Sequence, residues 1–508
     1  MAQRDGHKVL IRGVNWIGDA VMTIPALRAV RATFPESSIS LLVRPSVAPL
    51  FDREPAVDEI IQYGHEFRGV SGRMKLASTL RAKGFTTAIL FQNAFDAAFL
   101  ASLAGIPERI GYNRDGRGIL LTKAIPYRGE DRKLHHIDYY LNLLDKAGYT
   151  SERSRPWLRL TLEERLAARE TLSTMSRPIL GINPGAAFGS AKRWVLERFA
   201  EVARSFTEET GGSVAVFGGK DETATARYVQ ALIPHRSRSF AGRTSLREVV
   251  ALIAECDVVV SNDSGPMHIA YAVGTPVVAI FGSTDPKLTG PAGEGSTVVQ
   301  SGVPCSPCFE RTCREKHLAC MDGISADAVS DAVRTLTPRR RAVFFDRDGT
   351  LCRDADYLNR WEDFSVFPEI DALDTLRAAG FSLVGVSNQS GIGRGIVDES
   401  FARDVNRVFI ERYGFDDFLY CPHRPEELCF CRKPEPAMLI EAKERLGIDL
   451  RKSYVVGDKD DDMLLAGAVG AKGILVTTGK LRESVHADHT AQDLREAARF
   501  ILEDSNDR

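Results

Sequence analysis

Short hydrophobic runs alternate with stretches of helical periodicity along this chain, in three successive series. The runs predict strands at 8–12, 39–43, 86–91, 178–183, 213–217, 342–345, 381–386 and 453–456. The periodic stretches predict helices at 72–83, 136–147, 369–379 and 490–504. Strands that alternate with helices are typical of parallel sheets covered by helices. We therefore predict an α/β chain with domains at 1–172, 173–337 and 338–508, the last following the joint Thr-Pro-Arg-Arg-Arg at 337–341.

Composition narrows the class of protein. The 508 residues are 44% hydrophobic and carry a formal net charge of -2, which gives no electrostatic reason to expect a nucleic-acid partner. The N-terminus lacks the apolar core of a signal peptide, and no apolar run approaches the roughly 20 residues of a spanning helix. We expect a cytoplasmic protein without a transmembrane segment, one that can still rest on a membrane surface. Its nine cysteines are then free thiols or metal ligands.

Three loops of the first two domains carry the polar residues expected of a binding site. A glycine-containing turn after the first strand leads to Asp19, which is either a functional carboxylate or a helix N-terminal charge. The loop at 183–194 places Lys192 among small residues, which suits a pyrophosphate, although a flexible surface loop is the alternative. The third loop runs into a helix that begins near His268, and it presents N–H groups and a hydroxyl to an anion. Its candidate residues are Asp263, Ser264, Gly265 and His268.

These loops, in this order, resemble the lipopolysaccharide heptosyltransferase II family over roughly residues 7–337. The resemblance implies a GT-B fold of two Rossmann-like domains, ADP-heptose as donor and heptosyl-Kdo2-lipid A as acceptor. It also implies that Asp19 is the general base, that Lys192 and the 263–268 loop hold the diphosphate, and that Glu222 binds the ribose. Asp221 competes with Glu222 for that role. Because no Asp-x-Asp pair lies beside the donor loop, we predict transfer without a metal.

The third domain supplies polar residues at four predicted strand ends, and each has a role in phosphoryl transfer. Asp346 would be the nucleophile, and Asp348 would protonate the leaving oxygen and then activate water. The phosphoryl oxygens would be bound by Ser387, Asn388 and Lys433. Mg²⁺ would be held by Asp346, Asp458 and the main-chain carbonyl of Asp348.

This domain resembles the haloacid dehalogenase superfamily over about 340–482, in particular D-glycero-D-manno-heptose 1,7-bisphosphate 7-phosphatase, with histidinol-phosphate phosphatase as a near relative. The pattern Cys-x-His followed by Cys-x-Cys offers the ligand types that zinc prefers, although loop cysteines without metal are the alternative. The predicted structural zinc ligands are Cys421, His423, Cys429 and Cys431. Arg432 and the loop at 353–361 would contact the second phosphate.

Four further cysteines at 305, 308, 313 and 320 begin with a Cys-x2-Cys half-site but continue with uneven spacing. Metal ligands and free thiols are both compatible with that pattern.

The resemblances together imply a bifunctional enzyme of lipopolysaccharide core biosynthesis that acts on ADP-heptose and on heptose bisphosphate. One alternative is a histidinol-phosphate phosphatase joined to a glycosyltransferase of other sugar specificity. Another is that one half is only a binding scaffold.

Overall fold

The computed structural model describes residues 6–233 and 235–506. The first five residues, on which the expected lack of a signal peptide partly rests, lie outside that range. The chain forms two compact units, one of Met1–Leu160 with Glu164–Leu336 and one of Thr161–Glu163 with Thr337–Arg508. Within the described residues, no helix combines the length and apolar character needed to cross a bilayer.

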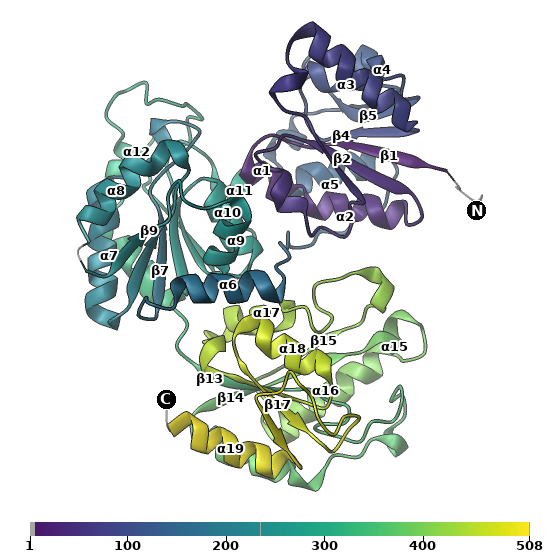
Figure 1. Cartoon of the computed structure of the whole chain (residues 1–508), viewed down its shortest axis with the longest axis vertical. Helices are drawn as coiled ribbons and strands as arrows, with labels where there is room; N and C mark the ends of the chain where they lie inside the picture. The colour runs from purple at the N-terminus through teal and green to yellow at the C-terminus, as the bar shows by residue number, and fades with distance from the viewer. Residues whose placement is uncertain (1–5, 234, 507–508) are drawn as a thin grey trace. The chain divides into compact units, whose positions relative to one another are not determined.

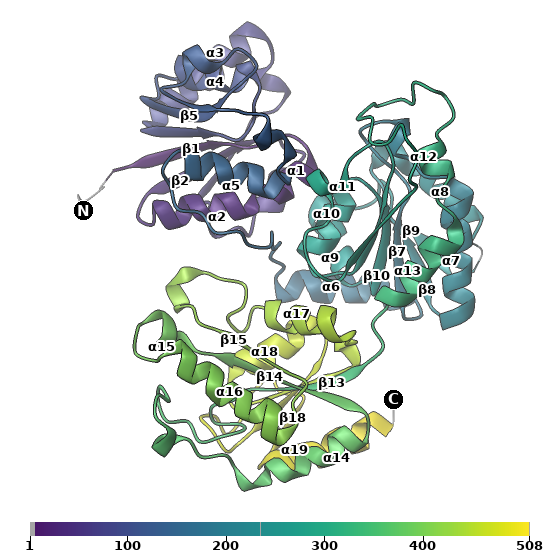
Figure 2. The same ribbon diagram turned by 180° about the vertical axis from the view of Figure 1, so that it is seen from behind.

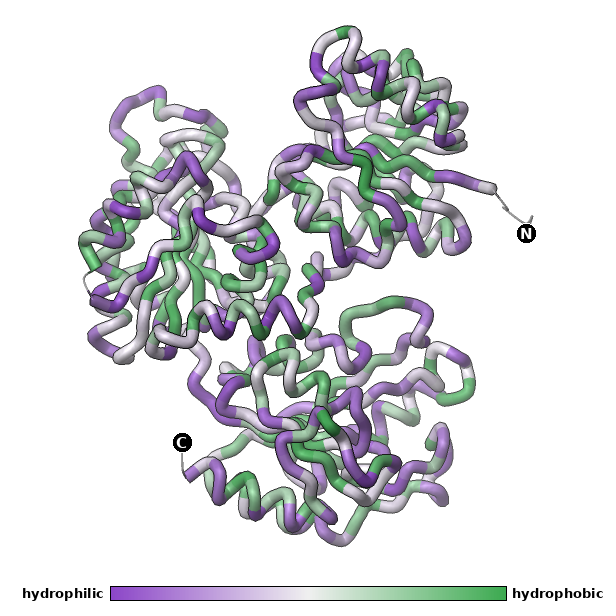
Figure 3. Tube along the Cα trace, viewed as in Figure 1, coloured by the Kyte–Doolittle hydropathy of each residue, from purple (hydrophilic) through white to green (hydrophobic). Residues whose placement is uncertain are grey.

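Three six-stranded sheets, all of parallel strands and all covered by helices, make up the two units (Figures 1 and 2). The predicted α/β class is therefore confirmed. Figure 3 shows hydrophobic residues concentrated along the strands, as expected for parallel sheets with both faces covered.

The first sheet has the order β3-β2-β1-β4-β5-β6. Its strands are β1 (Lys8–Arg12), β2 (Ser38–Val43), β3 (Glu59–Gln62), β4 (Thr87–Leu90), β5 (Glu108–Asn113) and β6 (Lys123–Pro126). Its helices are α1 (Ile17–Met22), α2 (Ile24–Thr33), α3 (Gly69–Lys83), α4 (Phe95–Leu103) and α5 (His136–Lys146).

The second sheet has the order β12-β11-β10-β7-β8-β9. Its strands are β7 (Ile179–Asn183), β8 (Ser213–Val216), β9 (Ser237–Ser239), β10 (Val258–Asn262), β11 (Val277–Phe281) and β12 (Ser296–Gln300). Its helices are α6 (Leu162–Leu172), α7 (Leu196–Thr210), α8 (Thr223–Ala231), α9 (Leu246–Ala254), α10 (Gly265–Ala272), α11 (Pro286–Thr289), α12 (Ala319–Asp322) and α13 (Ala326–Leu336).

The third sheet has the order β15-β14-β13-β16-β17-β18. Its strands are β13 (Arg341–Phe345), β14 (Phe381–Asn388), β15 (Asp417–Cys421), β16 (Tyr454–Gly457), β17 (Lys472–Val476) and β18 (His489–Ala491). Its helices are α14 (Leu373–Ala378), α15 (Ser390–Gly393), α16 (Glu399–Tyr413), α17 (Ala437–Leu446), α18 (Asp460–Val469) and α19 (Leu494–Asn506).

The prediction of a closing helix at 490–504 was wrong at its N-terminal end. Residues 489–491 form the edge strand β18, and Ala491 pairs with Val476 of β17. Helix α19 begins only after Asp493, whose carboxylate accepts the N–H groups of Arg495 and Glu496 at 2.9 and 3.0 Å. That side chain satisfies two N–H groups of the first turn, so it fixes the start of the helix.

The first strand of each series lies at the centre of its sheet. β1 lies between β2 and β4, β7 between β10 and β8, and β13 between β14 and β16. The strand order reverses at these positions, and open parallel sheets place ligands just beyond the carboxyl ends of such strands. The loops that follow β1, β7 and β13 are the ones in which the sequence analysis placed Asp19, Lys192 and Asp346.

Candidate active sites

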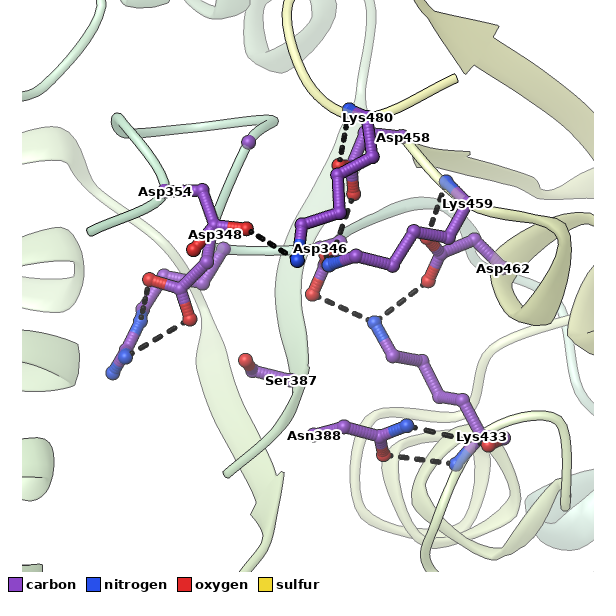
Figure 4. Close-up of polar contacts among 12 residues, drawn as sticks. Asp346, Asp348, Asp354, Ser387, Asn388, Lys433, Asp458, Lys459, Asp462 and Lys480 are labelled. Carbon is purple, nitrogen blue, oxygen red and sulfur yellow. Dashed lines mark hydrogen bonds and ion pairs between the residues drawn. The ribbon is translucent and has the colours of Figure 1, made fainter. Parts of the chain in front are cut away.

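Asp346 follows β13 directly and is 3% exposed. Its Oδ1 accepts from Lys433 Nζ at 2.7 Å, and its Oδ2 lies 3.7 Å from Lys459 Nζ (Figure 4). Burial alone would raise the pKa of this carboxyl, but Lys433 and Lys459 hold it below its usual range. The side chain is therefore ionised, as a nucleophile must be.

Two further buried carboxylates lie beside Asp346. Ligand oxygens of Asp346, Asp458 and Asp462 lie within 4.8 Å of one another, and Asp462 is fully buried. Converging carboxylate oxygens at a sheet edge suit Mg²⁺, so the residues present fit this ion. The side chain of Asp348 is not in the group, and its predicted contribution through the carbonyl stays a prediction.

Asp462 was missed by the sequence analysis. Its carboxylate lies 2.6 Å from Lys433 Nζ, so it holds the lysine from the side opposite Asp346. Its position four residues after Asp458, at the start of α18, is the signal that could have found it, since the first helical turn brings such residues to one place.

Asp348 is held from two sides by residues that the sequence analysis did not single out. The buried guanidinium of Arg347 donates to Asp348 through Nε at 3.2 Å and Nη2 at 3.0 Å, and its Nη1 donates to Asn406 Oδ1. Gln389 Nε2 donates to Asp348 Oδ2 at 2.7 Å and to Ser387 Oγ at 2.8 Å. The carboxylate is thereby oriented by three N–H groups and linked to Ser387.

Lys433 is positioned through its main chain. Its N–H donates to Asn388 Oδ1 at 2.9 Å, and its carbonyl accepts from Asn388 Nδ2 at 3.2 Å. The side chain of Asn388, predicted to bind the phosphoryl group, is thus engaged in bracing the lysine.

The four predicted zinc ligands come together in space, and the last of them, Cys431, stands two residues before Lys433 in the sequence. Their ligand atoms all lie within 4.8 Å of one another, with Cys421 Sγ 3.5 Å from His423 Nδ1 and His423 Nδ1 3.2 Å from Cys431 Sγ. Tetrahedral zinc with Zn–S bonds of about 2.3 Å needs ligand separations of roughly 3.5–3.8 Å. The donor set therefore fits a closed, structural zinc site.

Three further cations belong to this unit: Lys459, Lys480 and Arg432, the residue before Lys433. Lys459 Nζ lies 3.3 Å from Asp458 Oδ1. Arg432 has a buried Nη1 without a hydrogen-bond partner among the described residues. Lys480 Nζ lies 3.3 Å from Asp354 Oδ2, so it ties the 353–361 loop to the segment after β17 (Figure 4).

In the first unit, the loops after β7 and β10 come together as their positions in neighbouring strands require. The Lys192 ammonium contacts the Asp263 carboxylate, which also accepts from Thr284 Oγ1 at 2.6 Å. Asn183 Nδ2 donates to Ser264 Oγ at 3.0 Å. Three buried polar atoms here have no partner in the described part of the chain: Asn183 Oδ1, His268 Nδ1 and Ser283 Oγ. Such orphaned groups are expected where a polar ligand binds.

Asp19 and His268 are brought to the same place by close packing of α1 against α10. A Cβ on Gly18 would lie 2.5 Å from the His268 ring, and a Cβ on Gly265 would lie 2.9 Å from Ile17 Cβ. Only glycine permits this approach. The charge of Asp19 also acts on His268, so the predicted base lies near the predicted diphosphate loop.

Asp19 also opens onto a cavity of about 320 Å³ lined by Trp16, Asn93, Arg114, Arg132 and His136 among others. His136 Nδ1 lies 3.3 Å from Asp19 Oδ1 and was not predicted. The cavity offers room for a polar ligand beside the carboxylate.

Glu222 and Asp221 differ in where they point. The Glu222 carboxylate lies against Gly185 of the donor loop and accepts from Gly219 N–H at 2.9 Å, whereas Asp221 is exposed. The structure therefore favours Glu222 as the residue that faces the site.

A switch-point carboxylate beside a diphosphate-type loop suits a nucleotide-sugar transferase, and an Asp/Ser/Lys/Asp constellation on a Rossmann-like sheet suits a phosphatase. Comparisons with known proteins agree. Glycosyltransferase family 9 (heptosyltransferase) matches residues 73–319, and the HAD-hydrolase-like family matches residues 430–500. The chain is 33% identical over 306 residues to lipopolysaccharide heptosyltransferase 2 of Escherichia coli K12, covering 58% of this chain and 88% of the relative.

The C-terminal part is 42% identical over 154 residues to D-glycero-beta-D-manno-heptose-1,7-bisphosphate 7-phosphatase of Yersinia pestis, covering 27% of this chain and 81% of the relative. The solved structure of E. coli ADP-heptose lipopolysaccharide heptosyltransferase II aligns with a TM-score of 0.57 and 28% identity, over 65% of this chain and 98% of that one. The chain thus belongs to the family 9 heptosyltransferases in its N-terminal part and to the HAD-type heptose bisphosphate phosphatases in its C-terminal part. It is a glycosyltransferase with a GT-B fold and a phosphatase on one polypeptide.

Proposed function

We propose that the first unit transfers L-glycero-D-manno-heptose from ADP-heptose to heptosyl-Kdo2-lipid A, and that the second removes the 7-phosphate of D-glycero-D-manno-heptose 1,7-bisphosphate. The observation that supports both is the placement of a complete set of reactive groups at each switch point. We place the chain in the cytoplasm, with the acceptor reached at the inner membrane surface.

In the transferase, the acceptor hydroxyl would lose its proton to Asp19 as its oxygen bonds to the anomeric carbon and the bond from that carbon to the diphosphate breaks. His136 would orient the Asp19 carboxylate. Lys192, the N–H groups of the 263–268 loop and His268 would stabilise the charge of departing ADP, while Glu222 holds the ribose. Arg114 and Arg132, which line the cavity beside Asp19, offer cations to an anionic acceptor. Fixed cations can supply this stabilisation, so we propose transfer without a metal.

In the phosphatase, an Asp346 oxygen would attack phosphorus while the bond to the sugar oxygen breaks and Asp348 protonates that oxygen. Asp348 would then take a proton from the water that cleaves the aspartyl-phosphate, which releases phosphate and restores Asp346. Ser387 and Lys433 would bind the phosphoryl oxygens. Mg²⁺, held by Asp346, Asp458 and the Asp348 carbonyl with Asp462 beside them, would neutralise phosphoryl charge when bound. Arg432, with Lys459 and the 353–361 loop, would receive the second phosphate.

The assay that tests the two substrates measures ADP release and phosphate release from the same purified chain. We expect ADP release only when ADP-heptose and a heptosylated lipid A acceptor are both present. We expect phosphate release from heptose 1,7-bisphosphate to exceed that from histidinol phosphate. Preference for histidinol phosphate, or transfer from another nucleotide-sugar, would favour the alternative specificities.

The state of His268 gives a prediction of its own. Burial lowers the pKa of His268 to about 4, so the ring is neutral and can offer an N–H to a diphosphate at neutral pH. An unfolded histidine titrates near 6.5, so the unfolded chain binds the proton more tightly. This residue's contribution to stability is complete above about pH 6.5 and is lost as the pH falls toward 4, by about 3 kcal/mol.

The measurement is the free energy of unfolding of the first unit in the parent chain and in His268→Gln, from pH 7 to pH 4. We expect the free energy of unfolding of the parent, relative to that of His268→Gln, to fall by about 3 kcal/mol from pH 7 to pH 4. A difference that stays constant with pH would show that the folded protein accepts the proton on His268 without cost.

The predicted zinc site should support the phosphatase through Lys433. Cys429→Ser should remove one equivalent of zinc and lower phosphate release by roughly 10- to 100-fold, because the segment that carries Lys433 loses its anchor. Heptosyl transfer by the same preparation is the control for folding of the rest of the chain. Unchanged zinc content or unchanged phosphate release would contradict this role.

A further inference from the structure

Two helices of the first unit carry large apolar side chains on their outer faces. α3 and α4 pack on one face of the first sheet, and α2 and α5 cover the other (Figure 1). Val70 and Met74, one turn apart on α3, are exposed, and so are Phe95 and Phe99, one turn apart on α4. Ile119, in the short turn after β5 that contacts α4, is 89% exposed. We call these five residues the apolar patch.

The two helices hold the apolar patch together. α3 packs against α4, and Arg73 Nε of α3 lies 2.7 Å from Asp96 Oδ1 of α4. The rings of Phe95 and Phe99 stack with their centroids 6.3 Å apart. Asp96 is the one acidic residue of α4, so its pairing with Arg73 leaves this helix without an unpaired negative charge.

α4 is apolar on both of its sides. Phe95 and Phe99 face outward, whereas the inner face is buried against the sheet through Ala97, Ala98, Leu100 and Ala101. The outer face of a surface helix is normally polar, and a helix that is apolar all round is normally covered all round. Exposed apolar side chains that cluster and are bordered by polar residues mark a surface that meets a partner. The outer face of α4 is therefore expected to be covered when the protein works.

Basic residues border the apolar patch. Residues 65–83, which include α3, contain five Lys or Arg and a single acid, Glu66, in a chain whose formal net charge is -2. Arg68 and Lys75 are exposed and stand next to the patch residues of α3 in the sequence. Aromatic and aliphatic side chains bordered by Lys and Arg match the surface of a bilayer with anionic headgroups, because the rings enter the headgroup region while the cations meet the negative surface.

The apolar patch adjoins the cavity beside Asp19. Phe95 begins α4, directly beyond the loop after β4, and Ile119 lies in the turn beyond the loop after β5. The same two loops line the cavity, through Asn93 and Arg114. The carboxyl ends of parallel strands share one edge of the sheet, so the patch and the cavity lie at the same edge. A bilayer that contacts the patch therefore lies beside the loops that form the cavity.

We propose that the apolar patch and the basic residues around it dock the first unit on a bilayer surface that carries anionic lipid headgroups, with Phe95, Phe99 and Ile119 in the headgroup region. This inference rests on the transferase function proposed above, because the acceptor of that reaction is a lipid. Docking confines the chain and its acceptor to one surface. It therefore lowers the acceptor concentration at which transfer is half-maximal and leaves the chemical step unchanged.

The test measures sedimentation of the purified full chain with vesicles, in the absence of ADP-heptose and acceptor. We expect binding to vesicles of phosphatidylethanolamine and phosphatidylglycerol, and weaker binding at high salt or to vesicles of phosphatidylcholine alone. Phe95→Ser/Phe99→Ser should lower the vesicle partition coefficient roughly tenfold or more, because two rings lose their burial in lipid. Tyr228→Ser/Val298→Ser is the matched control and should stay within twofold of the parent. Tyr228 and Val298 are 46% and 37% exposed, against 46% and 39% for Phe95 and Phe99.

Three results would overturn the proposal. The first is a parent chain that does not sediment with the phosphatidylglycerol vesicles. The second is a Phe95→Ser/Phe99→Ser variant that binds them as the parent does, or no more weakly than the control. The third is a parent chain that is a dimer in solution and becomes a monomer in Phe95→Ser/Phe99→Ser, which would assign the apolar patch to a second copy of this chain. ADP affinity within twofold of the parent verifies that the variant is folded.

The effect on transfer has a separate readout. With the acceptor embedded in vesicles, Phe95→Ser/Phe99→Ser should raise the KM for acceptor roughly tenfold and keep kcat within twofold of the parent. With the same acceptor dispersed in detergent, both constants should stay within twofold. An unchanged KM on vesicles, or an equal rise in detergent, would refute docking as the cause. A parent chain that binds vesicles but transfers no heptose would count against the transferase function, while the docking surface would stand.

Discussion

Replacing Asp346 by Asn should abolish phosphate release, by about 10⁴-fold or more, because an amide cannot form the acylphosphate. The amide also leaves Lys433 without one of its two buried carboxylate partners, which are 2.7 and 2.6 Å away. Heptosyl transfer by the same molecules should stay within twofold of the parent, since Asp346 belongs to the other unit.

The matched control for this variant is Asp371→Asn, an exposed acid of the same unit. It should leave both activities unchanged. Phosphate release from Asp346→Asn within tenfold of the parent would remove Asp346 from the nucleophile's role. A parent chain without phosphatase activity would mean that the second unit is only a scaffold.

Replacing Asp19 by Ala should lower heptosyl transfer by roughly 10²- to 10⁴-fold, the usual contribution of a general base. Donor binding should survive, because the diphosphate is assigned to Lys192 and the 263–268 loop. The measurement is the turnover number together with the ADP dissociation constant. Asp52→Ala, an exposed acid of the same unit, is the control, and phosphate release should be unaffected in both variants.

Two results would contradict this assignment of Asp19. Turnover within a few-fold of the parent would leave Asp19 as no more than a helix N-terminal charge. Loss of ADP binding along with turnover would show that the carboxylate supports the donor loop through His268 and does not act on the acceptor.

The site residues that could be predicted from the sequence are those in a loop that directly follows a recognisable strand. Asp346 and Asp458 stand directly after runs of buried apolar residues, so the parallel-sheet pattern alone places them at one edge. The Cys-x-His and Cys-x-Cys pairs are similarly local. Each pair fixes two ligands through neighbouring residues, and the structure brings the two pairs together.

Other site residues depend on neighbours distant in the chain and gave little or no local signal. Arg347 binds Asp348 and Asn406, and the second of these lies 59 positions away on α16. His136 meets Asp19 across 117 positions, because α5 packs against α1. Gln389 joins Asp348 to Ser387 through its amide, a contact for which the local sequence gives no signal.

The most direct test of the whole account is to express residues 1–337 and 338–508 separately and to measure both reactions on each piece. We expect the first to transfer heptose from ADP-heptose without releasing phosphate from heptose bisphosphate, and the second to do the reverse in the presence of Mg²⁺. Two folded pieces that are inactive apart and regain activity only when joined would contradict the existence of two independent enzymes on this chain.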